Sequence, residues 1–135
     1  MNALQIVSRG EAKFVKTNIP NLKPGYALVR PQLVSLCGSD IWMLHYSADE
    51  MYPLPPGTSG HEIIAEIVDF QGDSDTLKKG ELCLAIAPDH RGMAEYYLAP
   101  IKNLIPLPQG KTAEEFLMSQ QLGTVIYAAK QLPNI

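Results

Sequence analysis

Cysteine is scarce in this sequence, and its scarcity excludes one class of fold. The 135 residues include only two cysteines, Cys37 and Cys83. Two thiols are too few for the disulfide framework that stabilises small secreted domains. We therefore expect both cysteines to be reduced and the protein to be cytoplasmic.

Basic runs and long apolar segments are also lacking. The chain has 11 Lys and Arg residues against 14 Asp and Glu residues, a net charge of -3. A mildly acidic chain without a basic run is a poor match for nucleic acid. No segment approaches the ~20 apolar residues of a membrane span, and residues 1–7 lack the pattern of a signal peptide. We expect neither nucleic acid nor a membrane as a partner.

The overall composition is that of one globular domain. Hydrophobic residues make up 46% of the chain and charged residues 19%. These fractions are ordinary for a folded protein and unlike those of a disordered one. A chain of this length can bury one hydrophobic core, but it is too short for two full domains.

Most of the chain is predicted to form short strands separated by turns. Segments rich in Val and Ile, bounded by Gly and Pro, are typical of strands. We expect strands at residues 1–7, 26–36, 62–70, 82–87, 93–98 and 102–105. Proline cannot donate to a ladder, so Pro31 predicts an edge or a bulge in the second strand. The pattern favours a mainly β fold, a small barrel or sandwich, over residues 1–110.

The end of the chain is predicted to be helical. Thr112 and Glu115 form the Thr-x-x-Glu pattern of a capping box. Residues 111–135 therefore read as a C-terminal helical segment. Gly123 is expected to divide it into two shorter helices, because glycine weakens a helix interior.

The segment Cys37-Gly38-Ser39-Asp40 is a predicted corner between a strand and a short helix. Glycine allows a sharp turn, and Ser39 or Asp40 can cap the helix that follows. A lone cysteine is most often a small buried apolar residue. At this corner, however, the Cys37 thiol can converge with other side chains on a cleft.

His61 and Glu62 follow Gly60 at the start of an apolar strand. Side chains alternate along a strand, so His61 and Glu62 cannot both face one cleft unless Gly60 relaxes the geometry. Taken alone, His61 fits a hydrogen-bonded structural histidine equally well. A thiolate and an imidazole are also common ligands of catalytic zinc, which takes three protein ligands and leaves a fourth position open.

Four short segments, in this order, resemble the zinc-dependent medium-chain alcohol and polyol dehydrogenases. They are Cys-Gly-Ser-Asp at 37–40, Gly-His-Glu at 60–62, Lys-Gly-Glu-Leu-Cys at 79–83 and Ala-Glu-Tyr at 94–96. Each segment alone is weak, but the combination is specific and covers nearly the whole chain. The resemblance implies a GroES-like β-barrel, mainly β with C-terminal helices.

The same resemblance implies a role for each residue of the site. Cys37 and His61 would bind zinc, and Ser39 would relay the substrate's proton. Asp40 would hydrogen-bond an imidazole, and Glu62 would support a ligand or compete as one. Zinc would polarise a small-molecule alcohol or carbonyl, and NAD(P) would exchange the hydride.

The third zinc ligand departs from the family pattern. In the family it is a Cys or Glu at the head of the last helix, and Gln120 stands in that place. A neutral amide oxygen is a poor zinc ligand. Either the single zinc binds weakly through Gln120, or water, Glu62 or another group completes the set, and Gln120 as plain helix surface is the alternative.

Two further features of the family are lacking. Many members carry four closely spaced cysteines that bind a structural zinc, where this chain has only Pro-Asp-His-Arg-Gly at 88–92. We expect His90 to be an exposed loop residue, with a place at the mouth of the cleft as the alternative. The Gly-x-Gly-x-x-Gly turn of a Rossmann cofactor domain is absent as well.

These absences lead to three expectations. Residues 111–135 lead toward a Rossmann cofactor domain that the 135 residues do not include. The isolated chain is expected to be inactive, and its uncovered apolar helices are expected to self-associate. Two other hypotheses keep the fold: a non-enzymatic GroES-like interaction module, and a zinc-free reductase fragment in which Cys37 only packs.

Overall fold

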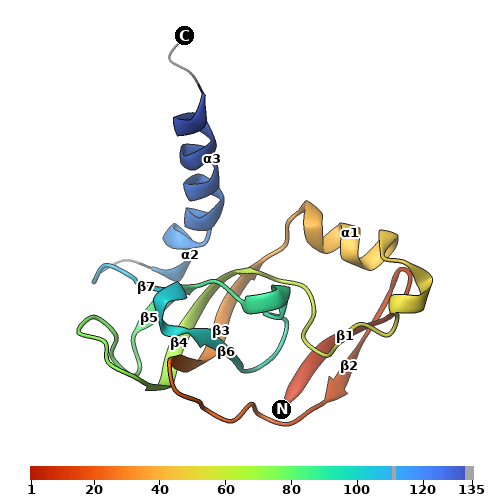
Figure 1. Cartoon of the computed structure of the whole chain (residues 1–135), viewed down its shortest axis with the longest axis horizontal. Helices are drawn as coiled ribbons and strands as arrows, with labels where there is room; N and C mark the ends of the chain where they lie inside the picture. The colour runs from red at the N-terminus through yellow and green to blue at the C-terminus, as the bar shows by residue number, and fades with distance from the viewer. Residues whose placement is uncertain (111, 133–135) are drawn as a thin grey trace.

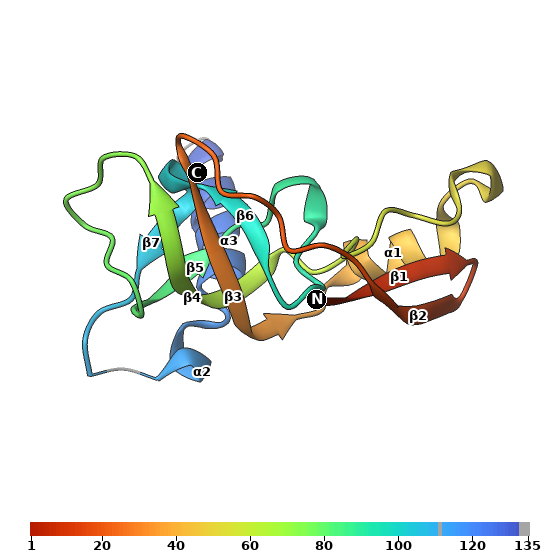
Figure 2. The same cartoon turned by 90° about the horizontal axis from the view of Figure 1, so that it is seen from below.

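Strands form most of the regular secondary structure, as a hairpin and a separate five-stranded sheet (Figures 1 and 2). The computed structural model describes residues 1–110 and 112–132. The hairpin joins β1 to β2, and the sheet has the order β6-β3-β4-β5-β7 with every pair antiparallel. The bounds are β1 (Asn2–Ser8), β2 (Glu11–Lys16), β3 (Tyr26–Ser35), β4 (Glu62–Gln71), β5 (Leu82–Ala85), β6 (Tyr97–Pro100) and β7 (Leu104–Pro106).

Helices occupy the connections and the C-terminal part. They are α1 (Gly38–Tyr46), α2 (Ala113–Phe116) and α3 (Ser119–Gln131), with 3-10 turns η1 (Asp49–Met51), η2 (Pro88–His90) and η3 (Ile101–Asn103). The prediction of a mainly β fold with C-terminal helices is confirmed. The hydrogen-bonded order begins with β6 and ends with β7, so the pairing does not close into a complete barrel within the described residues.

The central strands β3 and β4 set the position of the site. Their register runs from Tyr26 opposite Gln71 to Ser35 opposite Glu62. It shifts next to Pro31, which confirms the predicted bulge. Because the strands are antiparallel, the end of β3 meets the start of β4.

The core lies along these central strands, where β-branched and small side chains pack from both sides. Its fully buried members include Val29 of β3, Ile63 and Ile67 of β4, Cys83 of β5 and Ala99 of β6. Burial of a side chain such as Ile contributes roughly 1.5–3 kcal/mol to stability. The core therefore fixes the two strand ends that flank Cys37 and His61.

Several sequence predictions need correction. Strand β2 was not expected, because apolar and polar residues alternate only weakly along it and most of its side chains are exposed. The strand predicted at 93–98 begins only at Tyr97, since residues before it form turns and a single bridge from Ala94 to Ala3. Gly123 lies inside α3, and the helical stretch breaks at residues 117–118 instead.

The C-terminal helix α3 extends away from the sheet (Figure 1). The capping box before α2 is confirmed, since the Thr112 backbone N–H donates to Glu115 at 2.8 Å. The remaining residues of the expected 111–135 segment, 111 and 133–135, lie outside the described part of the chain. Within the described residues, no helix combines the length and apolar character needed to cross a membrane.

Candidate metal centre

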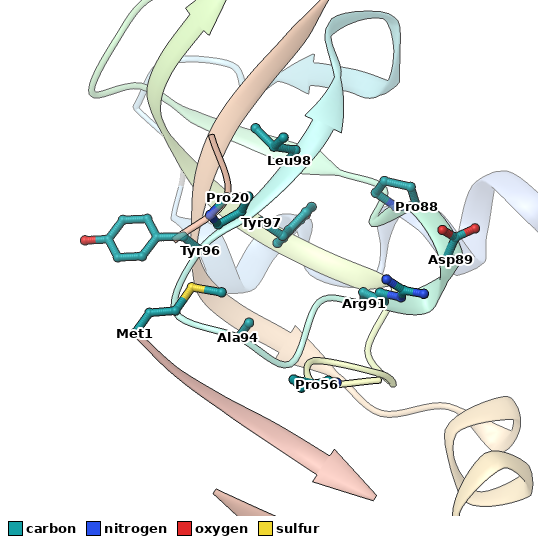
Figure 3. Close-up of a pocket in the computed structure, with 10 residues that line it drawn as sticks. All are labelled: Met1, Pro20, Pro56, Pro88, Asp89, Arg91, Ala94, Tyr96, Tyr97 and Leu98. Atoms are coloured by element: carbon teal, nitrogen blue, oxygen red, sulfur yellow. The ribbon is translucent and has the colours of Figure 1, made fainter. Parts of the chain in front are cut away.

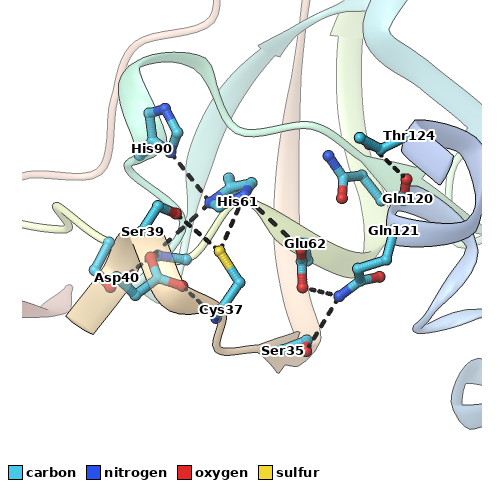
Figure 4. Close-up of polar contacts among 12 residues, drawn as sticks. Ser35, Cys37, Ser39, Asp40, His61, Glu62, His90, Gln120, Gln121 and Thr124 are labelled. Atoms are coloured by element: carbon cyan, nitrogen blue, oxygen red, sulfur yellow. Dashed lines mark hydrogen bonds and ion pairs between the residues drawn. The ribbon is translucent and has the colours of Figure 1, made fainter. Parts of the chain in front are cut away.

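The two ends of the β3–β4 pair bring three metal-ligating side chains together. Cys37 follows the end of β3, and His61 directly precedes β4, whose first residue is Glu62. Ser59 and Gly60 have φ of 96° and 72°, so His61 is placed by a turn and not by the regular strand. The alternation rule therefore does not separate His61 from Glu62, and Figure 4 shows His61 in contact with both the Cys37 sulfur and the Glu62 carboxylate.

The distances between the three ligand atoms fit one small cation. Cys37 Sγ lies 3.6 Å from His61 Nε2, and His61 Nε2 lies 3.9 Å from a Glu62 carboxylate oxygen. All three ligand atoms lie within 4.8 Å of one another. Zinc bonds of about 2.0–2.3 Å place tetrahedral ligand atoms roughly 3.3–3.8 Å apart. Shifts of less than about 1 Å would bring the group onto a common ion.

The donor types also suit zinc. A cysteine sulfur, an imidazole nitrogen and a carboxylate oxygen are the ligands that zinc takes in proteins, and three of them leave a fourth position open. When ionised, Cys37 and Glu62 together carry two negative charges, which match a divalent cation. The side chains of His61 and Glu62 are 14% and 4% exposed, so water screens the site only in part.

Asp40 organises the corner on which Cys37 stands. Its carboxylate accepts from the backbone N–H of Cys37 at 2.9 Å, from Gly60 N–H at 2.7 Å and from the Ser59 hydroxyl at 2.9 Å. Burial alone would raise the pKa of Asp40, but these three hydrogen bonds outweigh it and hold that pKa below its usual value. Asp40 thereby ties the start of α1 to the turn before His61.

Asp40 lies within ion-pair distance of the His61 imidazole, but the hydrogen bond expected of it is made by another residue. Asp40 Oδ1 lies 3.9 Å from His61 Nδ1, beyond hydrogen-bond distance. His90 Nδ1 lies 3.1 Å from the same His61 atom. His90 is exposed, as predicted for a loop residue. Its contact with His61 also agrees with the alternative, a place at the mouth of the cleft.

A glutamine of α3 reaches the group, but it is not Gln120. The Gln121 side-chain amide donates to Glu62 and, at 3.5 Å, to Ser35 Oγ. Its oxygen is buried and has no hydrogen-bond partner among the described residues. Gln120 lines a separate hollow with Ile86 and Ile105. A helix turns about 100° per residue, so neighbouring Gln120 and Gln121 point in different directions. Gln120 as a zinc ligand stays a prediction.

Ser39 lies in the first turn of α1, beside the sulfur of Cys37. The Ser39 hydroxyl oxygen is 2.8 Å from Cys37 Sγ, and the side chain is exposed. The N-cap of α1 is Cys37 and not Ser39. The hydroxyl of Ser39 is therefore not used for capping the helix.

A second hollow is lined in part by residues of the η2 turn (Figure 3). Its volume is about 250 Å³, and its walls include Pro88, Asp89 and Arg91 from the turn and Tyr97 from β6. Cys37, His61 and Glu62 do not line it. This hollow is therefore separate from the candidate metal centre.

The two cysteines are expected to differ sharply in reactivity. Cys83 is fully buried, and burial raises the pKa of its thiol to about 12, so thiolate is scarce at neutral pH. Cys37 is partly exposed. Iodoacetamide at pH 8 should alkylate one cysteine in the folded chain and two in urea, as counted by mass spectrometry. Peptide mapping that finds Cys83 modified in the folded chain would contradict this expectation.

Sequence comparison identifies relatives of this chain. Residues 23–109 match the alcohol dehydrogenase GroES-like domain. D-altritol 5-dehydrogenase of Agrobacterium fabrum is 35% identical over 82 residues, 60% of this chain and 24% of that protein. L-threonine 3-dehydrogenase of Caldanaerobacter subterraneus is 31% identical over 75 residues, 55% of this chain and 22% of that protein. The matched regions thus span about a quarter of the length of these relatives.

Solved structures show the same fold at low sequence identity. 2R,3R-butanediol dehydrogenase from Bacillus subtilis has a TM-score of 0.77 at 17% identity, covering 96% of this chain and 47% of that one. Galactitol-1-phosphate dehydrogenase from Escherichia coli has a TM-score of 0.73 at 21% identity, covering 87% and 41%. These matches confirm the expected GroES-like fold.

Proposed function

Because the chain belongs to the alcohol dehydrogenase GroES-like domain family, we propose that it is the zinc-binding catalytic domain of an NAD(P)-dependent oxidoreductase. The proposed reaction interconverts a small-molecule alcohol and its carbonyl by hydride transfer. The observation that supports it most is the convergence of Cys37, His61 and Glu62 within 4.8 Å. We also propose a cytoplasmic location with both thiols reduced.

In this proposal, the chain's own residues bind the metal and relay the substrate's proton. Cys37, His61 and Glu62 are the three protein ligands. Zinc, when bound, supplies a Lewis acid that polarises the oxygen of the alcohol or carbonyl. The Ser39 hydroxyl, 2.8 Å from the Cys37 sulfur, is exposed beside the ligand set. It can accept the proton of an incoming alcohol and pass it to solvent.

Gln121 has a supporting role in the same proposal. Its amide donates to the Glu62 oxygen that faces α3, while the other Glu62 oxygen faces His61. This hydrogen bond holds the carboxylate so that one oxygen remains directed at the metal position. A neutral glutamine here leaves Cys37 and Glu62 as the two anionic ligands.

Two further proposals concern cofactor binding and self-association. The 135 residues contain no Gly-x-Gly-x-x-Gly turn, so we propose that they do not bind NAD(P) or turn over substrate by themselves. Apolar side chains of α3 (Leu122, Val125, Ile126 and Tyr127) are 47–67% exposed. We propose that this face self-associates in the isolated chain, which sedimentation velocity at two concentrations tests.

Cobalt(II) titration tests the proposed function directly. Cobalt replaces zinc and reports thiolate ligation and coordination geometry in its visible spectrum. We expect one cobalt per chain, a sulfur-to-metal band, and a change in the spectrum when imidazole is added to the open position. Absence of stoichiometric binding by the folded chain, or binding that imidazole does not perturb, would contradict a catalytic site.

A further inference from the structure

We infer that His90 is the residue that positions His61 for metal binding, a role that the family resemblance assigned to Asp40. The inference rests on the function proposed above. The two imidazole rings meet edge to face, with centroids 4.6 Å apart and an interplanar angle of 74°. Figure 4 shows His90 on the side of His61 away from Glu62.

Both carboxylate oxygens of Asp40 already accept hydrogen bonds from other donors. Its two carboxylate oxygens accept from Cys37 N–H, Gly60 N–H and the Ser59 hydroxyl at 2.7–2.9 Å. The distance from Asp40 Oδ1 to His61 Nδ1 is 3.9 Å. At 3.1 Å, His90 Nδ1 is the partner within hydrogen-bond reach.

This contact permits two arrangements of protons on the two rings, and metal binding through His61 Nε2 requires one of them. One Nδ1 must donate and the other must accept, since two lone pairs would repel. A neutral His61 that presents a lone pair on Nε2 toward Cys37 carries its proton on Nδ1. It then donates to the unprotonated Nδ1 of His90, which carries its own proton on Nε2. In the inferred arrangement, His90 accepts from His61 Nδ1 and so stabilises the tautomer that can bind metal.

The backbone fixes His90 against the turn that carries His61. Ser59 N–H donates to the His90 carbonyl at 2.5 Å, and Gly92 N–H donates to the carbonyls of Ser59 and Gly60 at 3.1 and 3.0 Å. His90 itself has a φ of 53°, a conformation that histidine and asparagine adopt more readily than most residues. The short η2 loop therefore places the second imidazole as part of the folded turn.

Two substitutions separate the imidazole's role from that of the loop. His90→Gly removes the ring and tolerates a positive φ, whereas His90→Asn keeps an acceptor oxygen three bonds from Cα, where Nδ1 stands. We expect His90→Gly to weaken zinc binding about 10- to 100-fold, and His90→Asn to stay within about threefold of wild type. The control is His45→Ala, an exposed histidine on α1, which should leave the affinity unchanged.

Zinc affinity is measured by competition with a chromophoric chelator, with thermal unfolding of each variant as the folding control. Equal affinity of wild type and His90→Gly overturns the inference. So does an equal loss in His90→Gly and His90→Asn.

A measurement without metal keeps this inference apart from the proposed function. Long-range ¹H–¹⁵N correlation of the metal-free chain should show His61 protonated on Nδ1 and unprotonated on Nε2. The opposite tautomer overturns the role of His90, whether or not zinc binds. The expected tautomer in a folded chain that binds no zinc would overturn the proposed function and leave the orientation of His61 by His90 standing.

Discussion

Replacing His61 with alanine is expected to lower the zinc affinity of this chain by roughly 100- to 1,000-fold. Zinc held by four ligands in small domains contributes about 10–16 kcal/mol, so one ligand supplies roughly 2.5–4 kcal/mol. Each 1.4 kcal/mol corresponds to about a factor of ten in affinity. Chelator competition on His61→Ala, Cys37→Ala and Glu62→Gln measures the effect for each proposed ligand.

The comparison among these variants identifies the third ligand. Glu62→Gln removes the charge at nearly constant shape, so a large loss of affinity assigns Glu62 to the metal. A loss in Cys37→Ala and His61→Ala, with wild-type affinity in Glu62→Gln, would remove Glu62 from the ligand set. His45→Ala is again the matched control for His61→Ala. Unchanged zinc affinity in His61→Ala would contradict the proposed centre itself.

Gly92→Ala is expected to destabilise the fold by about 3 kcal/mol or more, because the added methyl group has no space. A Cβ at Gly92 would overlap the Gly60 carbonyl oxygen and the end of the Ile63 side chain, and would lie 3.2 Å from the Gly60 carbonyl carbon. The Gly92 N–H also donates to the Gly60 carbonyl at 3.0 Å. Relieving this overlap would require a shift of the backbone turn that places His61.

Gly123→Ala provides the control for this substitution. A Cβ at Gly123 meets nothing within 4 Å, and alanine inside a helix is favoured over glycine by about 0.5–1 kcal/mol. Urea unfolding followed by circular dichroism should show a large loss for Gly92→Ala and none for Gly123→Ala. Equal free energies of unfolding for wild type and Gly92→Ala would show that the turn is looser than its contacts indicate.

The sequence predicted the parts of this protein that depend on local patterns. The Val- and Ile-rich strand beginning at Glu62 and the bulge at Pro31 follow from side-chain pattern and from the missing N–H of proline. Cys37 and His61 were paired through a family resemblance, and the antiparallel β3–β4 register explains physically how they meet.

Other features depend on the three-dimensional packing and could not be predicted in the same way. Gln121 and Gln120 are chemically identical, and only the phase of α3 relative to the sheet decides which one reaches Glu62. His90 carries no motif, and its contact with His61 arises from a loop folded back by backbone hydrogen bonds. Strand β2 lacks the alternation that marks a half-buried strand, and it is held by its pairing with β1.

X-ray absorption at the zinc edge of the zinc-loaded chain tests the central claim most directly. If Cys37, His61 and Glu62 hold the ion, the spectrum will show one sulfur at about 2.3 Å and nitrogen or oxygen neighbours at about 2.0–2.2 Å. A spectrum with nitrogen and oxygen neighbours alone would place zinc away from Cys37 and contradict the account.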